Sequence, residues 1–194
     1  MRLLILGGTA WLGHTVAALA RDHGHDVTCL ARGSAAVPEG VRLVVADRSV
    51  SDPGASADPQ AGPDPYAAVP GEWDAVLDVS RQPGQVRAAV RALAGRAAYL
   101  AFVSTCSVYA DSSAPHPDES AAVVEPFVGE VAGDADYGSG KVACEQAVLA
   151  GFGAARCLIA RAGLIGGPGD WSGRSGYWPW RFANPATEDE QAHA

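Results

Sequence analysis

Short apolar segments alternate with segments of helical character along most of the chain. An apolar run covers residues 3–6, and a segment of helix-forming composition follows at residues 15–20. Further strand-like segments cover residues 26–31, 41–47, 73–80, 98–105 and 156–162, and further helical segments cover residues 86–93 and 137–150. Strands that alternate with helices form a parallel sheet covered on both faces. The pattern therefore predicts an α/β fold with a doubly wound parallel sheet in three layers.

Two long polar segments interrupt this alternation. Residues 49–71 are rich in proline, glycine, alanine and aspartate, and the prolines would break the crossover helix expected there. We predict a long, mobile surface loop with at most a helical turn. Residues 110–135 are also polar and contain prolines, which predicts a second loop. A main nucleotide-binding domain is expected over residues 1–167, followed by a tryptophan-rich stub and polar tail over residues 168–194.

A glycine-rich turn, Gly-Gly-Thr-Ala-Trp-Leu-Gly, occupies residues 7–13 between the first strand and the first helix. Gly7 lets the chain reverse sharply, and Gly13 lets the helix pack closely on the strand. The first N–H groups of the helix then face an anion, and a dinucleotide pyrophosphate is the usual ligand. Ala10 replaces the middle glycine of the pattern G-x-x-G-x-x-G, and many such turns use glycine for packing alone. The turn predicts nucleotide binding only together with other motifs.

The ends of the next two strands bear on the choice of nucleotide. An acidic residue at the end of the second strand would hold the adenosine ribose hydroxyls, but Arg32 stands there. A guanidinium suits a 2′-phosphate, so we expect NADP(H) rather than NAD(H). NAD(H) stays open, and an ordinary solvated arginine is the alternative. Asp47 ends the third strand and is expected either to receive the adenine amino group or to cap a turn.

Charge and cysteine content exclude several classes of function. The 194-residue chain has a formal net charge of −8, which argues against nucleic acid and anionic membranes as partners. No apolar run is long enough to span a bilayer and the N-terminus lacks the features of a signal peptide, so we expect a cytoplasmic protein. The four cysteines lack the spacing of a metal site or a disulfide framework and are expected in the core: Cys29, Cys106, Cys144 and Cys157.

Residues 137–141, Tyr-Gly-Ser-Gly-Lys, place a phenol and an ammonium four residues apart, on one face of the predicted helix. A nearby cation favours the phenolate and lowers a tyrosine pKa toward the working range. Tyr137 could then give a proton to a carbonyl oxygen or take one from an alcohol, while Lys141 holds the ribose hydroxyls of the cofactor. The alternative is a surface pair, because this spacing is common by chance.

Hydroxyl side chains follow the fifth predicted strand, at the edge where ligands bind in open α/β sheets. Residues 104–109 are Ser-Thr-Cys-Ser-Val-Tyr. We expect Thr105 first, and Ser107 second, to hydrogen-bond the substrate oxygen while Tyr137 moves the proton. A strand-end hydroxyl that bonds only the backbone is the alternative.

In this order along the chain, the glycine turn, Arg32, residues 104–109 and residues 137–141 resemble the extended short-chain dehydrogenase/reductase superfamily, whose members are often called NAD-dependent epimerase/dehydratases. Residues 7–13 are similar to the branch written G-G-T-x-F-x-G, which also lacks the middle glycine. The similarity continues through residues 107–111, 137–145, 163–170 and 177–179. The resemblance implies a Rossmann-type domain with α/β/α layers.

The resemblance also implies a role for each matching position. The cofactor would be bound by Gly7, Thr9, Ala10, Trp11, Leu12 and Gly13 at the pyrophosphate, Arg32 at the 2′-phosphate, Asp47 and Arg48 at the adenine, Ser80 and Lys141 at the ribose, and Ala162, Gly163, Leu164 and Ile165 at the nicotinamide amide. The catalytic residues would be Tyr137 as acid/base, Lys141 as its partner and Thr105 as the substrate hydroxyl. Ala10, Thr105 and Ala162 differ from the commonest residues of the superfamily, although Thr105 preserves a hydroxyl.

The C-terminal stretch departs from the pattern. Extended members resemble a longer chain with a C-terminal substrate region, whereas this chain stops soon after the sixth predicted strand. Residues of the last stretch would begin that region and would line a small pocket, form a dimer face or cover an apolar surface: Trp171, Arg174, Tyr177, Trp178, Trp180 and Arg181. A homodimer therefore stays open as a partner, beside a small-molecule substrate.

The resemblance implies an NADP(H)-dependent oxidoreductase that acts on a carbonyl or alcohol of a small molecule. An epimerase or dehydratase is the variant, although Cys106 and Ser107 stand where a dehydratase would want acidic residues beside Thr105. A truncated NADP-binding module without turnover is a second hypothesis. RNA binding, a property of some relatives in the branch, is disfavoured by the net negative charge of the chain.

Overall fold

The computed structural model describes residues 1–49, 64–111, 113, 118–170 and 172–185. The chain divides into two units, Met1–Arg161 and Ala162–Ala194. The predicted boundary after residue 167 lies slightly further along the chain.

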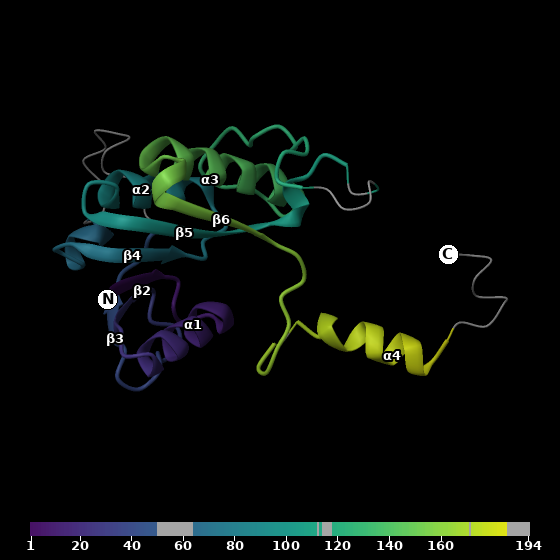
Figure 1. Ribbon diagram of the computed structural model, residues 1–194, viewed down its shortest axis with the longest axis horizontal. Helices are drawn as coiled ribbons and strands as arrows, with labels where there is room; N and C mark the ends of the chain where they lie inside the picture. Colours follow the sequence, from purple (N-terminus) through teal and green to yellow (C-terminus); the bar gives the residue numbers. More distant parts are fainter. Residues whose placement is uncertain (50–63, 112, 114–117, 171, 186–194) are drawn as a thin grey trace. The chain divides into compact units, whose positions relative to one another are not determined.

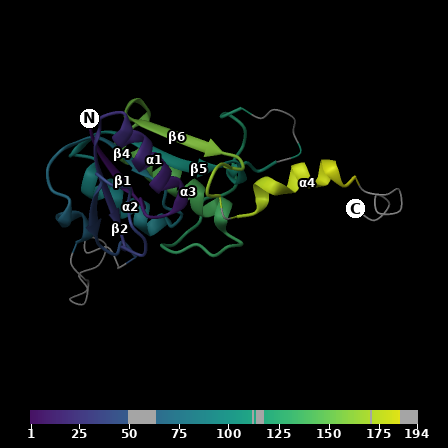
Figure 2. The ribbon, with the colours of Figure 1, turned by 90° about the horizontal axis from the view of Figure 1, so that it is seen from below.

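A six-stranded sheet in the order β3-β2-β1-β4-β5-β6 forms the framework. Its strands are β1 (Arg2–Leu6), β2 (Asp26–Ala31), β3 (Arg42–Val45), β4 (Trp73–Asp78), β5 (Ala97–Thr105) and β6 (Cys157–Ala162). The pairings of β1 with β2 and β4, of β2 with β3, and of β4 with β5 are parallel. Strand β6 lies beside β5 at one edge (Figure 2). The predicted doubly wound parallel sheet is confirmed.

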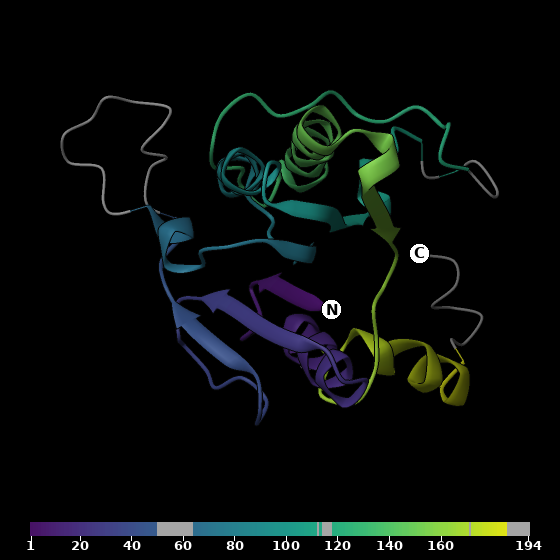
Figure 3. The ribbon, with the colours of Figure 1, turned by 60° about the vertical axis from the view of Figure 1, so that its left-hand side comes forward.

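Helices cover both faces of this sheet. Helix α1 (Trp11–Asp22) lies on one face, and α2 (Pro83–Leu93) and α3 (Tyr137–Phe152) lie side by side on the other (Figures 1 and 3). Successive residues of β1 point to opposite faces, so Ile5 packs with Ala17 of α1, whereas Leu4 joins Phe102 and Val148 in the core beneath α2 and α3. The alternation of side chains along the central strand therefore creates the three predicted layers.

The register brings the carboxyl ends of the central strands to one edge. Leu6 at the end of β1 pairs with Leu30 of β2 and with Asp78 of β4, and Asp78 also pairs with Phe102 of β5. The chain runs outward from β1 in both directions, first to β2 and β3 and then to β4, β5 and β6. Ligands of open α/β sheets bind at such a switch point, outside the carboxyl ends of the strands.

The segments predicted as loops contain little regular structure where they are described. Of residues 49–71, residues 50–63 lie outside the described residues, and Pro65–Ala68 form a single 3₁₀ turn, which agrees with the predicted helical turn. The expectation of a surface loop was wrong for this part, because Tyr66 and Val69 are buried in the core. In the second segment, residues 112 and 114–117 lie outside the described residues, and Tyr109 forms an isolated antiparallel bridge with Val123. This bridge folds the segment back toward the end of β5.

The cysteines follow the prediction only in part. Cys29 and Cys144 are fully buried, as expected for small core side chains. Cys157 is half-buried, and Cys106 is exposed. The expectation for Cys106 was wrong because this residue follows the last residue of β5 and begins a short 3₁₀ turn, so that it lies beyond the covered part of the sheet.

The second unit contains a helix that the sequence did not predict. A 3₁₀ turn at Arg174–Gly176 leads into α4 (Tyr177–Ala183). Pro179 lies in the first turn of α4, where a backbone N–H would have no partner within the helix, so the proline is tolerated. Large apolar side chains of α4 are exposed: Tyr177, Trp178, Trp180 and Phe182. Trp171 lies outside the described residues.

Candidate functional site

A cleft of about 420 Å³ opens at the carboxyl edge of the sheet, where the segments that follow β1, β2, β3 and β4 meet. Six of the predicted cofactor residues line it, namely Gly7, Thr9, Ala10, Arg32, Asp47 and Arg48. Seven further residues that the sequence analysis missed also line it, namely Leu30, Ala31, Ser34, Ala46, Arg81, Gln82 and Gln85. For the polar ones the signal was a position shortly after β2 or β4, or in the first turn of α2. The cleft therefore brings together side chains that are far apart in the sequence.

The glycine turn forms the part of the cleft next to β1 and α1. Gly7 has a φ of +101°, and a Cβ at this position would lie 2.7 Å from Val79 Cγ2. A Cβ at Gly13 would lie 2.5 Å from the carbonyl oxygen of Gly7. Both positions therefore require glycine, and the close approach of α1 to the turn leaves the first backbone N–H groups of the helix at the edge of the sheet. Such a cradle fits the pyrophosphate of a dinucleotide.

Arg32 and Asp47 occupy the ends of β2 and β3 beside the cleft. Both side chains are exposed at its mouth, and Ser34 lies close by in the sequence. Asp47 accepts hydrogen bonds from the backbone N–H and the hydroxyl of Ser49, and these bonds lower the pKa of its carboxyl. The turn-capping interpretation of Asp47 is thus confirmed, whereas its contact with an adenine stays a prediction.

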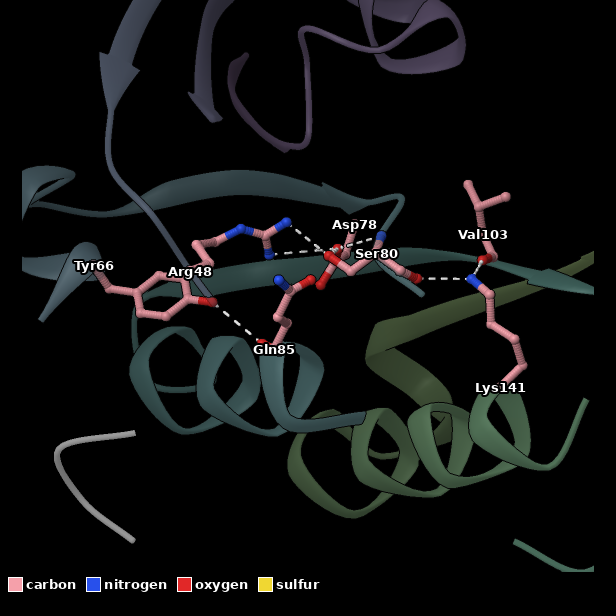
Figure 4. Close-up of polar contacts among 7 residues, drawn as sticks. All are labelled: Arg48, Tyr66, Asp78, Ser80, Gln85, Val103 and Lys141. Atoms are coloured by element: carbon pink, nitrogen blue, oxygen red, sulfur yellow. Dashed lines mark hydrogen bonds and ion pairs between the residues drawn. The ribbon is translucent and has the colours of Figure 1, made fainter. Parts of the chain in front are cut away.

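Arg48 turns inward instead of toward solvent (Figure 4). Its Nη2 atom donates to Ser80 Oγ at 2.7 Å, and its Nη1 atom lies 3.7 Å from Asp78 Oδ1. The backbone N–H of Ser80 donates to the same Asp78 oxygen at 2.9 Å, and the Ser80 hydroxyl donates to it as well. Nearby, the Tyr66 hydroxyl donates to the carbonyl of Gln85, and burial raises the pKa of Tyr66 to about 12. Ser80, predicted near the ribose, is therefore part of a buried charged cluster.

Lys141 lies beneath the carboxyl ends of β4 and β5. Its side chain is buried, and Nζ donates to the carbonyl oxygens of Ser80 and Val103, both at 2.7 Å (Figure 4). The ammonium also lies 4.5 Å from the centre of the Phe102 ring. Burial lowers the pKa of Lys141. An ammonium has three N–H donors. Two of them bind these carbonyls among the described residues, which leaves one donor for a ligand.

Tyr137 begins α3, and its side chain is 37% exposed. The guanidinium of Arg81 lies over its ring at 5.7 Å and also pairs with Asp134. The cation seen over the phenol is thus Arg81, whereas the Lys141 ammonium binds backbone carbonyls. Arg81 also lines the cleft, so one side chain contacts both the cleft and the ring of the residue predicted as the acid/base, whereas Tyr137 is not one of the lining residues.

Thr105 is the last residue of β5 and is buried. Its Oγ1 atom accepts from the backbone N–H of Ser107 and lies 3.2 Å from Ser107 Oγ, whereas Ser107 is exposed. The alternative role of Thr105, a strand-end hydroxyl that bonds the backbone, is therefore present in the structure. Its contact with a substrate stays a prediction.

A second buried charged cluster lies behind this strand end and was missed by sequence reasoning. Glu145 of α3 accepts from Ser104 Oγ, and Arg161 of β6 donates to both of its carboxylate oxygens, with Nη2 2.8 Å from Oε2. The bond to Glu145 raises the pKa of Arg161 further above its usual range. The signal was a charge of opposite sign inside each of two mainly apolar segments, Glu145 within residues 142–150 and Arg161 within residues 157–162. This cluster ties α3 and β6 to the residue that precedes Thr105.

The remaining predicted cofactor residues lie outside the cleft lining. Trp11, Leu12 and Gly13 form the first turn of α1, directly after the lining residue Ala10. Residues 162–165 belong to the second unit, Ala162–Ala194, and are not among the residues that line the cleft. Their predicted contact with the nicotinamide amide stays a prediction.

Within the described ranges, none of the helices combines the length and the apolarity needed to cross a membrane.

Comparisons with known proteins agree with this arrangement. A 3-diazoavenalumate denitrifying reductase from a Streptomyces species is 43% identical over 47 residues, which cover 24% of this chain and 16% of the reductase. The chain also resembles the UDP-N-acetylglucosamine 4-epimerase from Bacillus cereus, with 17% identity, a TM-score of 0.58, and coverage of 82% of this chain and 53% of the epimerase. It also resembles the Bordetella bronchiseptica enzyme WbmG in complex with NAD, with 15% identity, a TM-score of 0.63, and coverage of 94% of this chain and 59% of WbmG.

These structural likenesses show the fold, and the chain spans little more than half the length of the solved structures that it matches. The family model described as NAD dependent epimerase/dehydratase covers residues 3–184, which is nearly the whole chain. The chain therefore belongs to the NAD-dependent epimerase/dehydratase family.

Proposed function

We propose that the protein is an NADP(H)-dependent oxidoreductase that acts on a carbonyl or alcohol group of a small molecule. The observation that carries this proposal is the position of Arg81, which lines the nucleotide cleft and also lies over the ring of Tyr137. A ligand in the cleft would therefore lie near a phenol. Family membership supports a nucleotide-dependent enzyme.

The residues of the cleft fit a dinucleotide. The backbone of the turn from Gly7 to Ala10 would hold the pyrophosphate, with the start of α1 behind it. Asp47 would lie at the adenine end, and the remaining donor of Lys141 would reach a ribose hydroxyl. When bound, the nicotinamide ring supplies or accepts the hydride, which no side chain of the protein can do.

The side chains of the protein would manage the proton and the substrate oxygen. Tyr137 would donate its proton to a carbonyl oxygen, or remove one from an alcohol in the reverse direction. The hydroxyl of Thr105 or Ser107 would donate a hydrogen bond to the same oxygen and hold it in place. The buried Lys141 ammonium would supply positive charge at the carboxyl edge of the sheet, where negative charge develops.

The proposed preference for NADP(H) over NAD(H) depends on the residues that follow β2. Arg32 and Ser34 both line the cleft there, and a guanidinium with a nearby hydroxyl suits a 2′-phosphate. NAD(H) is the alternative, because the matched enzyme WbmG was solved with NAD.

Two other functions follow from specific observations. A sugar-nucleotide epimerase or dehydratase is favoured by the matched UDP-N-acetylglucosamine 4-epimerase. A binding module without turnover is favoured by the position of the Lys141 ammonium, which donates to backbone carbonyls, while the cation over the Tyr137 ring is Arg81. Both would use the same cleft.

The first experiment identifies the nucleotide. Mass spectrometry of the native protein should find NADP⁺ or NADPH, and the fluorescence of added NADPH should change on binding. Consumption of NADPH with one member of an aldehyde and ketone panel would support the oxidoreductase. Binding without consumption, together with interconversion of a UDP-sugar, would support the epimerase. Binding without either reaction would favour the module, and lack of binding to both NADPH and NADH would refute the proposal.

A further inference from the structure

Lys141 is the only lysine of the chain, whereas thirteen positions carry arginine. An amine is a compact point charge whose pKa shifts readily on burial, and a guanidinium is planar and always charged. The one amine side chain of the protein is buried at the carboxyl edge of the sheet, where its Nζ atom binds Ser80 and Val103. Its position there depends on the two carbonyl oxygens that hold it.

These two carbonyls differ in how firmly the fold holds them. Val103 lies inside β5, so its backbone is part of the sheet. Ser80 lies beyond the end of β4, and the N–H of Val79 makes the last backbone bond to β1, with Leu6. The position of the Ser80 carbonyl therefore depends on contacts other than the strand pairing.

Those contacts come from Asp78 and Arg48. Asp78 accepts from both the backbone N–H and the hydroxyl of Ser80, so it fixes the backbone just before the carbonyl that binds Lys141. Arg48 donates to the Ser80 hydroxyl at 2.7 Å. The hydroxyl therefore donates its one proton to Asp78 and accepts from Arg48, so both residues hold it.

The ion pair of Arg48 and Asp78, which holds Ser80, has a geometry that gives little stability by itself. The side chains of Arg48 and Asp78 are 9% and 1% exposed, but their nearest charged atoms are 3.7 Å apart. Among the described residues, Arg48 Nη1 and Asp78 Oδ2 have no hydrogen-bond partner. A buried ion pair with imperfect geometry is weak support for stability, and such pairs can instead specify one arrangement of the chain.

We propose that Arg48 and Asp78 are positioning residues that set the place of the Lys141 ammonium by holding Ser80 between them. This inference rests on the proposed function only for the chemical role of the Lys141 ammonium. The contacts among Arg48, Asp78, Ser80 and Lys141 do not depend on a bound cofactor. Arg48 thus acts beyond its predicted place beside the adenine. Through Ser80 it joins the segment after β3 to α3.

The single lysine makes a direct test possible. Protein labelled with ¹⁵N-lysine at Nζ gives one side-chain ammonium resonance, which reports the position and hydrogen bonds of Lys141 alone. We expect Arg48→Met to shift this resonance and to speed exchange of the ammonium protons about fivefold or more, because the amine opens to water. Arg42→Met is the matched control: Arg42 begins β3, at the other end of the strand from Arg48, and it also donates to a hydroxyl, that of Thr28. It should change the exchange rate by less than about twofold.

Two further samples separate positioning from loss of folding. The double variant Arg48→Met with Asp78→Asn removes both charges of the buried pair, so neither partner is left without the other, and its backbone amide spectrum reports whether it folds. It should still show the shifted Lys141 resonance. Methylguanidinium added to Arg48→Ala should restore the wild-type resonance, which a merely structural defect would not allow.

The outcomes distinguish this inference from the proposed function. A Lys141 resonance that responds alike to Arg48→Met and Arg42→Met would overturn the inference, as would failure of methylguanidinium to restore it in folded Arg48→Ala. NADPH titration of the same unmodified protein tests the proposed function separately. A protein that binds no nucleotide but shows the expected Lys141 pattern would keep the inference and refute the proposed function.

Discussion

The guanidinium of Arg81 lies 5.7 Å from the centre of the Tyr137 ring. Arg81 comes from the loop between β4 and α2, and Tyr137 comes from the first turn of α3. The contact therefore joins the loop at the mouth of the cleft to the helix that carries the predicted acid/base. Asp134, which pairs with Arg81, is almost fully exposed, so this ion pair contributes little to stability.

Tyr137→Phe is expected to keep the affinity for NADPH and to lower turnover about 100-fold to 10,000-fold, because it removes only the phenolic hydroxyl, which is the group that would move the proton. The measurement is NADPH consumption with a carbonyl substrate from the panel, beside a fluorescence titration. Tyr99→Phe is the matched control, since Tyr99 is similarly exposed, at 39% against 37%, and lies on β5. Equal turnover of the two variants would remove Tyr137 from the mechanism.

Arg32→Asp is expected to move the preference from NADPH toward NADH by about tenfold or more, because a carboxylate repels a 2′-phosphate and accepts bonds from ribose hydroxyls. The ratio of the two dissociation constants, measured by fluorescence, checks this. Arg42→Asp makes the same charge change on β3, and Arg42 is not one of the residues that line the cleft. A ratio that moves equally in both variants would show a general charge effect and count against Arg32.

Gly13→Ala is expected to weaken NADPH binding and to lower the free energy of unfolding by about 1–3 kcal/mol. The added Cβ would lie 2.5 Å from the Gly7 carbonyl oxygen and 2.9 Å from Gly8 Cα, so α1 would have to move away from the turn. Urea unfolding and NADPH titration measure the two effects. Gly95→Ala is the control, because its Cβ would meet nothing within 4 Å. A Gly13→Ala variant as stable as Gly95→Ala would mean that α1 does not pack against the turn as described.

The sequence was sufficient for the strands, the layers and the glycine turn because these depend on local patterns. Apolar runs predicted the strands, and parallel pairing then placed Gly7, Arg32 and Asp47 at one edge of the sheet. The second unit was harder. Pro179 within a helix of seven residues argues against a helix, but the first turn tolerates it.

The side-chain pairings could not be predicted in the same way. Periodicity indicates which residues are buried, but not which distant group a long side chain reaches. The spacing of Tyr137 and Lys141 suggested that they pair, yet the Lys141 ammonium reaches the carbonyl of Ser80, sixty-one positions earlier. Arg48 likewise bonds Ser80 across thirty-two positions. Only the packed sheet brings these groups together.

Glu145→Ala is expected to lower the free energy of unfolding by about 3 kcal/mol, because it leaves Arg161 partly buried without its carboxylate. Glu130→Ala is the matched control. Its ion pair with Arg87 has a similar shortest N···O distance, 2.9 Å against 2.8 Å, but it uses one carboxylate oxygen and Glu130 is 62% exposed, so about 1 kcal/mol or less is expected. Urea unfolding of both variants makes the comparison, and equal losses would show that burial does not strengthen the Glu145 pair.

Two buried thiols should make the protein less stable at alkaline pH. Burial raises the pKa of Cys29 to about 11 and that of Cys144 to about 12, from 9.0. As the pH rises above 9, the unfolded chain loses these protons first, so unfolding becomes more favourable until the folded pKa values are passed. Two pKa units correspond to about 2–3 kcal/mol for Cys29.

Unfolding by urea across this pH range, compared between variants, isolates the contribution of each thiol. Cys29→Ala should lose stability less steeply with rising pH than the unmodified protein, whatever its stability at neutral pH. The control is Cys106→Ala, because Cys106 is exposed and its removal leaves both buried thiols in place. Contributions from Lys141 and other groups are present in all three proteins and cancel in the comparison. If Cys29→Ala and Cys106→Ala lost stability equally steeply, the alkaline loss would arise from groups other than the Cys29 thiol.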